Sequence, residues 1–314
     1  NQLYNPLYSK EDIVKEHWLN SPVNTERAYR NEVLGMFFSG SSAPITPEEI
    51  YEKCRDEGRM FTKNISITEN KAVYAGFDWG DLVDAESGLT GEGEESSGRR
   101  GQSYSCGVIL TADTPHILSI EFATILKKND PDYKKEVVEQ MFRQYNVKSG
   151  VGDIGYANDL TYNLQKEHGD KFLASRACPS VKNHIRLENS IFPKEIQFER
   201  DYLIKELYDM MKQGRIRFPY GSYEQIGWLI NHCCSMELKA TPDRFGELKL
   251  RYVKGSSPND GFMALLNAYL AYKYDISQGF AVHDPNRLQT DPRERRKILA
   301  VTGYMPKMNP LRRA

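Results

Sequence analysis

The pattern of apolar and polar positions predicts strands from residue 71 onward. Residues 71–80, 105–113 and 116–126 are runs of β-branched and aromatic side chains separated by turn residues, which is typical of consecutive antiparallel strands. Between the first two runs, residues 84–102 consist largely of Gly, Ser and Glu. This composition predicts a long, flexible hairpin loop.

The remainder of the chain alternates between helical and strand patterns. Apolar residues at helical spacing predict helices over 130–146, 157–169, 199–214 and 259–274. In the first of these, Val137, Met141 and Tyr145 share one face. Short apolar runs predict strands over 149–155, 171–179 and 215–219, and a hairpin over 237–255. A meander followed by alternating strands and helices predicts an α/β fold, a mixed sheet with helices on both faces.

Three segments follow from these patterns. Residues 1–70 contain helical and extended pieces, including a helix start at Thr46-Pro-Glu-Glu49, where a capping box precedes a helix that Gly58 would end. We interpret this segment as a linker or the tail of a preceding domain. Residues 71–276 form the main domain. Residues 277–314 are polar, Pro-containing and basic, which predicts a flexible tail.

Composition excludes several classes of protein. The chain has 314 residues, and 39% hydrophobic and 11% aromatic residues suffice for a sizeable core, so wholesale disorder is excluded. No apolar run approaches the ~20 residues that cross a bilayer. The opening is polar and starts with Asn, so we expect no signal peptide and a fragment of a longer chain. Five cysteines without a CxxC pair favour a reducing compartment.

The net charge of −1 conceals two uneven segments. Residues 78–95 contain seven acids and no base, whereas residues 287–313 contain eight bases against two acids. Local patches of this kind can bind partners that the total charge would not suggest.

Three aspartates lie where elements should end or begin. Asp78 closes the first predicted strand, Asp153 closes the short strand over 149–155, and Asp260 opens the last helix. If the two strands are neighbours, Asp78 and Asp153 project side by side, and a helix crossing the sheet would bring Asp260 to the same point. Three clustered carboxylates repel one another and are tolerated mainly around a divalent cation, and hard oxygen ligands favour Mg²⁺ or Mn²⁺.

A structural interpretation competes with this one, since an Asp in a DxG or NDG context is often a turn or helix-cap residue. Asp260 in particular could simply cap its helix. Lys249, Arg251 and Lys254 precede the third Asp on the predicted hairpin. They form either an ordinary solvated strand face or a set of contacts to a phosphate backbone, and both possibilities stay open.

Three motifs resemble those of a known family: GFDWG at 76–80, GDIGYANDL at 152–160 and NDGFMALLNAYLAY at 259–272. They are similar to the C-terminal nuclease domain of tailed-bacteriophage terminase large subunits. The stretch ERAYRNEVLGMF resembles the exit from the ATPase domain of that motor, which would make residues 1–70 its tail. No Walker A pattern occurs in the chain.

The resemblance implies an RNase H-like fold and an endonuclease that cuts concatemeric double-stranded DNA by two-metal-ion hydrolysis. It places catalysis and two Mg²⁺ or Mn²⁺ ions at Asp78, Asp153 and Asp260. Candidates for a fourth ligand are Asp81, Glu121 and Asp159. Implied partners are double-stranded DNA, the portal, the terminase small subunit and other large subunits, at the procapsid portal vertex in the infected cytoplasm, with no membrane involved.

Two alternatives remain open. In an actin-like ATPase, the turns Asp78-Trp-Gly80 and Asp153-Ile-Gly155 would hold nucleotide phosphates, although Asp81 stands where Thr or Ser is expected. The second alternative is a non-catalytic DNA-binding or docking module with an RNase H-like fold.

Overall fold

The computed structural model describes ten stretches of the chain. They are residues 43–61, 71–80, 103–114, 116–155, 158–181, 183–188, 193–242, 246, 248–255 and 257–279. The chain divides into two units, Asn1–Lys273 and Tyr274–Ala314. In the second unit the described residues are 274–279, the end of the last helix. The predicted loop over 84–102 and nearly all of the predicted tail lie outside the described residues.

The strands are β1 (Arg55–Met60), β2 (Ala72–Asp78), β3 (Cys106–Thr114), β4 (Ile117–Ile125), β5 (Ser149–Asp153), β6 (Phe172–Cys178), β7 (Ile185–Glu188), β8 (Glu195–Glu199), β9 (Ile216–Tyr220), β10 (Met236–Pro242) and β11 (Leu248–Lys254). The helices are α3 (Pro47–Lys53), α4 (Pro131–Gln144), α5 (Asn158–His168), α6 (Arg200–Lys212), α7 (Trp228–Cys233) and α8 (Asp260–Gly279), with a 3₁₀ turn at Gly169–Lys171 and a π-helix at Tyr223–Gly227.

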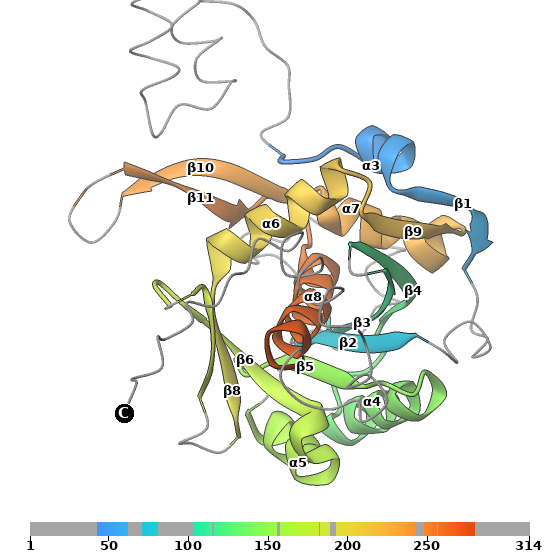
Figure 1. Cartoon of the computed structure of the whole chain (residues 1–314), viewed down its shortest axis with the longest axis vertical. Helices are drawn as coiled ribbons and strands as arrows, with labels where there is room; N and C mark the ends of the chain where they lie inside the picture. Colours follow the sequence, from blue (N-terminus) through green and yellow to red (C-terminus); the bar gives the residue numbers. More distant parts are fainter. Residues whose placement is uncertain are drawn as a thin grey trace, which may run out of the picture. The chain divides into compact units, whose positions relative to one another are not determined.

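Nine of the strands form one mixed sheet in the order β1-β9-β4-β3-β2-β5-β6-β8-β7, and β10 and β11 form a separate ribbon. The antiparallel meander β2-β3-β4 is confirmed. On the other side of β2, strands β5, β6 and β8 continue the sheet in parallel, and β7 closes it in antiparallel orientation. The expected α/β fold, a mixed sheet with helices on both faces, is confirmed (Figure 1).

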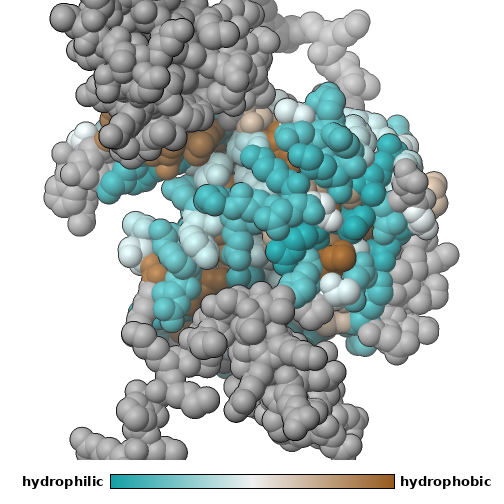
Figure 2. Space-filling view, turned by 45° about the horizontal axis from the view of Figure 1, so that its top comes forward, coloured by the Kyte–Doolittle hydropathy of each residue, from teal (hydrophilic) through white to brown (hydrophobic). Residues whose placement is uncertain are grey.

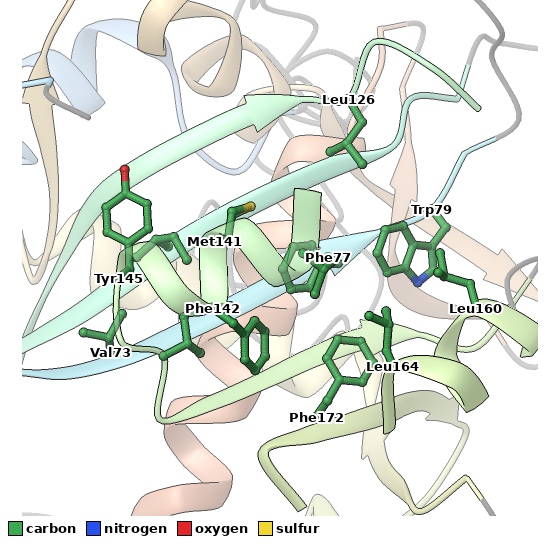
Figure 3. Close-up of a cluster of buried hydrophobic side chains, with 14 residues drawn as sticks. Val73, Phe77, Trp79, Leu126, Met141, Phe142, Tyr145, Leu160, Leu164 and Phe172 are labelled. Atoms are coloured by element: carbon green, nitrogen blue, oxygen red, sulfur yellow. The ribbon is translucent and has the colours of Figure 1, made fainter. Parts of the chain in front are cut away.

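One face of the sheet packs against α4 and α5. Figure 3 shows the hydrophobic cluster between this face and the two helices. Strand β2 contributes Val73, Ala75 and Phe77 to it, and the segment after β2 contributes Trp79. The rings of Phe77 and Trp79 stack with centroids 5.5 Å apart. Since side chains alternate along a strand, the even-numbered residues of β2 face the other way, toward α8.

The predicted inner face of α4 is confirmed and extends further round the helix. Met141 and Tyr145 are buried and the half-buried Val137 packs against the core, to which Val138 and Phe142 also contribute. The i, i+3, i+4, i+7 spacing of the four buried residues, from Val138 to Tyr145, gives a wider apolar stripe than the predicted set.

Helix α8 crosses the opposite face of the sheet in direct backbone contact with β2. A Cβ at Gly76 would lie 2.1 Å from both Ala264 O and Ala268 N of α8. Asn267 fixes the crossing point, because its Nδ2 donates to the carbonyl of Phe77 at 2.6 Å and its Oδ1 accepts from Ser175 Oγ of β6 at 3.0 Å. The first three turns of α8 are apolar nearly all round and buried, as expected of a helix enclosed by the core.

The predicted helix ending at Gly58 was too long. The capping box of Thr46 and Glu49 is present, but α3 ends at Lys53. Residues 55–60 instead form β1, which pairs in parallel with β9. Arg59 of this strand bonds to the buried carboxylate of Glu121 on β4 at 3.0 Å, a tertiary contact that local helical propensity could not reveal. Strands β7 and β8 were not predicted.

In the view of Figure 2, the coloured surface is mostly hydrophilic with small hydrophobic areas. Among the described residues, the exposed large hydrophobic side chains lie on six different elements: Tyr51, Met60, Tyr162, Tyr202, Tyr223 and Leu248. Among the helices that the structure describes, none combines the length and apolarity needed to span a membrane.

The contact at Gly76 predicts a large effect of a single methyl group. Gly76→Ala should lower the free energy of unfolding by about 3 kcal/mol, because neither backbone can yield without displacing α8. Urea unfolding followed by circular dichroism measures the change. Gly58→Ala on β1 is the matched control, since the nearest atom to its new Cβ is 3.7 Å away. Equal stability of the two variants would contradict the direct packing of α8 on β2.

Candidate active site

The ends of three elements place the predicted aspartates at one edge of the sheet. Asp78 and Asp153 are the last residues of β2 and β5, which pair in parallel with Phe77 opposite Gly152. Both side chains project toward the face that α8 crosses, because they alternate with core residues of the other face. Asp260 is the first residue of α8.

Asp78 lies in a charged and crowded environment. Burial raises the pKa of its carboxyl group well above the usual value, and the charges of Asp260 and Asp153 raise it further. The charge of Lys254 partly opposes this shift. The residue as a whole is only partly buried. A carboxylate of this kind gains from a cation that neutralises it.

Asp260 is buried, with 3% of its surface exposed. Its Oδ1 accepts a hydrogen bond from Ser103 Oγ at 3.0 Å, and Lys254 Nζ is 3.9 Å from the same oxygen. Its Oδ2 is buried and has no hydrogen-bond partner within the described part of the chain. Because an unsatisfied buried carboxylate oxygen is costly, this atom is a place where a cation would be stabilising.

The Asp153 carboxylate accepts hydrogen bonds from the backbone of the turn that follows it. Its Oδ2 accepts from the backbone N–H of Gly155 at 3.1 Å, and the N–H of Ile154 contributes as well. Burial raises the pKa of the Asp153 carboxyl group, although these two hydrogen bonds and the charge of Arg176 work against the rise.

Two segments close against each other beside the aspartates. Ser105 Oγ accepts from the N–H of Gly80 at 3.1 Å and donates to the Gly80 carbonyl at 3.2 Å. A Cβ at Gly80 would lie 2.3 Å from Ser103 O, so this approach requires glycine. The contact holds Ser103 where its hydroxyl reaches Asp260, and Cys106 lies directly opposite Asp78 in the antiparallel pairing.

The side chains at this site have the right chemistry for a divalent cation, but their present arrangement does not form a complete set of ligands. Asp78 and Asp260 offer hard oxygen ligands, and Asp260 Oδ2 accepts no hydrogen bond from the residues that the structure describes. However, no group of three or more His, Cys, Asp or Glu side chains in the described part of the chain is arranged to hold a metal. Binding by all three aspartates would therefore require their side chains to rearrange.

The candidates for a fourth metal ligand either do not contact Asp78, Asp153 or Asp260 or lie outside the described residues. Glu121 bonds to Arg59 and to Thr111 Oγ1 at 2.6 Å, within a network of the meander. Asp159 is exposed in the first turn of α5. Asp81 lies outside the described residues.

The three basic candidates do not share one face of β11. Lys254 ends the strand beside Asp260 and lies on the same face as Tyr252, which packs on Tyr208 of α6. Lys249 and Arg251 are exposed and lie on the opposite face. Of the three residues, one therefore lies beside Asp260 and two lie on the outer face of the ribbon.

Sequence reasoning missed three residues around Asp260. Ser103 and Tyr104 precede β3, and the charge of Asp260 helps to raise the pKa of the Tyr104 hydroxyl, after the larger effect of burial. His232 lies on α7 and accepts the N–H of Gly261. The register between β2 and β3 would have pointed to Ser103, because Asp78 pairs with Cys106, but no local signal pointed to His232.

Comparisons with known proteins gave structural neighbours only. No family model and no curated protein matches the chain. The large terminase nuclease from thermophilic phage G20c is 15% identical with a TM-score of 0.44, covering 70% of this chain and 95% of its own. The HK97 bacteriophage large terminase is 15% identical with a TM-score of 0.44, covering 84% and 51%. The nuclease domain of large terminase subunit gp2 of bacterial virus Sf6 is 11% identical with a TM-score of 0.42, covering 71% and 96%. At these values the similarity is one of fold alone.

Proposed function

We propose that this chain is a metal-dependent DNA endonuclease, the nuclease part of a viral DNA-packaging terminase large subunit. The observation that carries the proposal is the meeting of three element ends, where Asp78 and Asp153 close adjacent strands and Asp260 opens the helix that crosses them. The motif resemblance at the same three positions supports the same assignment. The substrate is concatemeric double-stranded DNA, and the partners are the portal, the small subunit and other large subunits.

In this proposal Asp78, Asp153 and Asp260 hold two Mg²⁺ or Mn²⁺ ions. When bound, such ions supply the positive charge and the activated water that phosphodiester hydrolysis needs. Ser103 orients Asp260 by donating to Oδ1, while Oδ2 has no donor among the described residues. Lys254 supplies a protein cation next to the carboxylates, where the phosphate of a substrate would lie.

The ribbon of β10 and β11 extends the proposed contact with DNA. Lys239 of β10 lies directly opposite Arg251 of β11, so both side chains share the outer face with Lys249. Lysine and arginine on such a face bind phosphates without reading sequence, which fits cutting with little sequence preference.

A second candidate function is a non-catalytic DNA-binding module with this fold. One observation favours it: the described residues hold no three ligands arranged for a metal ion. Addition of Mn²⁺ separates the two candidates, because the non-catalytic module would show neither DNA cleavage nor a metal-dependent rise in melting temperature. A rise with ATP instead would favour the actin-like nucleotide-binding alternative.

The first prediction concerns metal binding without DNA. Millimolar Mn²⁺ should raise the melting temperature over that in chelator, because a ligand at a hundredfold excess over Kd adds about 2.7 kcal/mol. Asp78→Asn and Asp260→Asn should lose this rise. Asp132→Asn, an exposed aspartate in the first turn of α4, is the matched control and should keep it. An equal rise in all four proteins would place the metal elsewhere.

The second prediction concerns catalysis. Asp78→Asn should reduce plasmid nicking with Mn²⁺ at least about 100-fold, because charge stabilisation by bound metal is worth several kcal/mol. Its melting temperature in chelator should hold or rise, since the substitution removes a carboxylate whose charged form the fold disfavours.

The same pair of measurements tests a purely structural role for Asp78. If the residue only stabilised its turn, Asp78→Asn would lower the free energy of unfolding by about 1 kcal/mol and leave nicking intact. Full nicking by a stable Asp78→Asn protein would therefore refute the proposed site.

The third prediction concerns the ribbon. The double variant Lys249→Ala/Arg251→Ala should weaken DNA binding and reduce the slope of log K against log salt concentration by about 2, for two lost phosphate contacts. Fluorescence anisotropy with labelled duplex measures both. The control removes two exposed lysines at the other face of the sheet, Lys166→Ala/Lys171→Ala, and should leave the slope unchanged. Equal slopes for both double variants would exclude the ribbon as a DNA contact.

A further inference from the structure

A buried histidine contacts the helix turn that carries Asp260. His232, on α7, is 7% exposed, and its Nδ1 accepts a hydrogen bond from the backbone N–H of Gly261 at 2.9 Å. Gly261 directly follows Asp260 in the first turn of α8. The imidazole therefore satisfies one of the backbone donors that every helix leaves unpaired at its start.

The packing around this hydrogen bond leaves no room for a side chain at position 261. A Cβ at Gly261 would lie 2.6 Å from the ring of Trp228 and 2.9 Å from Leu229, so α7 rests directly on the first turn of α8. The Trp228 ring meets the His232 ring edge-on at 5.2 Å. Asn259, which precedes the helix, has its Nδ2 on Met236 Sδ at 3.1 Å.

The direction of the bond defines the state of the ring. Because the Gly261 N–H can only donate, Nδ1 must be the unprotonated nitrogen, and the neutral ring carries its hydrogen on Nε2. Burial also lowers the pKa of His232 to about 4, with Asp260 opposing and Lys254 adding to the shift, so the ring is neutral near pH 7.

We infer that His232 is a positioning residue that acts through the Gly261 N–H to fix the first turn of α8, and with it the direction of the Asp260 carboxylate toward Asp78. Ser103 holds the same carboxylate from the opposite strand segment. The backbone of the first turn of α8 is thus held by His232 on α7, and the Asp260 side chain is held by Ser103. This inference rests on the proposed function, because its consequence is measured as metal affinity at the proposed site.

The experiment compares three variants of the full chain. His232→Leu keeps an apolar side chain of similar bulk but removes the acceptor, whereas His232→Asn keeps an acceptor oxygen near the position of Nδ1. His168→Leu removes another partly buried imidazole, which packs on Phe142 at the other face of the sheet. For each protein the Mn²⁺ concentration for half-maximal plasmid nicking is measured, together with the melting temperature in chelator.

We expect His232→Leu to raise the Mn²⁺ concentration for half-maximal nicking about tenfold, the size typical of losing a residue that orients a metal ligand. For His232→Asn, the Mn²⁺ concentration for half-maximal nicking should stay within about threefold of that of the unaltered protein, because an acceptor is retained. His168→Leu should leave it unchanged. An unchanged Mn²⁺ requirement in His232→Leu, or equal loss in the Leu and Asn variants, would overturn the inference.

A readout without metal or DNA separates this inference from the proposed function. A long-range ¹H–¹⁵N spectrum in chelator should show the His232 hydrogen on Nε2, and hydrogen exchange at the Gly261 amide should accelerate in His232→Leu. A hydrogen on Nδ1 refutes the inference even in an active nuclease. An unaltered protein that shows the expected spectrum, but neither nicking nor an effect of Mn²⁺ on melting, refutes the proposed function and the role assigned to His232 within it.

Discussion

The contact between α8 and β2 is the constraint on which the rest of the structure depends. At Gly76 the two backbones touch with no side chain between them, and Asn267 ties the helix to both β2 and β6. The helix can therefore neither slide nor rise from the sheet without losing buried hydrogen bonds. This fixed crossing brings the start of α8 to the carboxyl ends of β2 and β5.

That arrangement concentrates negative charge where the fold cannot easily neutralise it. Burial and two neighbouring carboxylates raise the pKa of Asp78, and Asp260 retains a buried oxygen to which no described residue donates. Such features lower stability, and proteins keep them mainly where a ligand or a reaction uses them. The apolar packing of α8 on the sheet supplies the rigidity that holds them in place.

The sequence predicted most of what local patterns can determine. The meander, helix α8 and the positions of Asp78, Asp153 and Asp260 at element ends all follow from apolar periodicity and turn residues. It did not predict β1, which exists through pairing with β9 rather than through its own composition. It also missed Ser103, which bonds to Asp260, and His232, which bonds to the adjacent Gly261, because both come from distant parts of the chain and neither carries a local motif.

The state of Asp153 explains how three aspartates can lie at one edge without forming a finished metal site. Its carboxylate accepts hydrogen bonds from its own turn, so coordination of a cation would compete with the Gly155 N–H. Each such bond contributes about 1 kcal/mol net, which is small against the binding energy of a divalent ion to several carboxylates. The backbone of all three aspartates is fixed, since Asp78 and Asp153 end paired strands and Asp260 lies in the first turn of α8. Under the proposed function, a cation would therefore complete its site by drawing one carboxylate away from its turn, without a movement of the backbone.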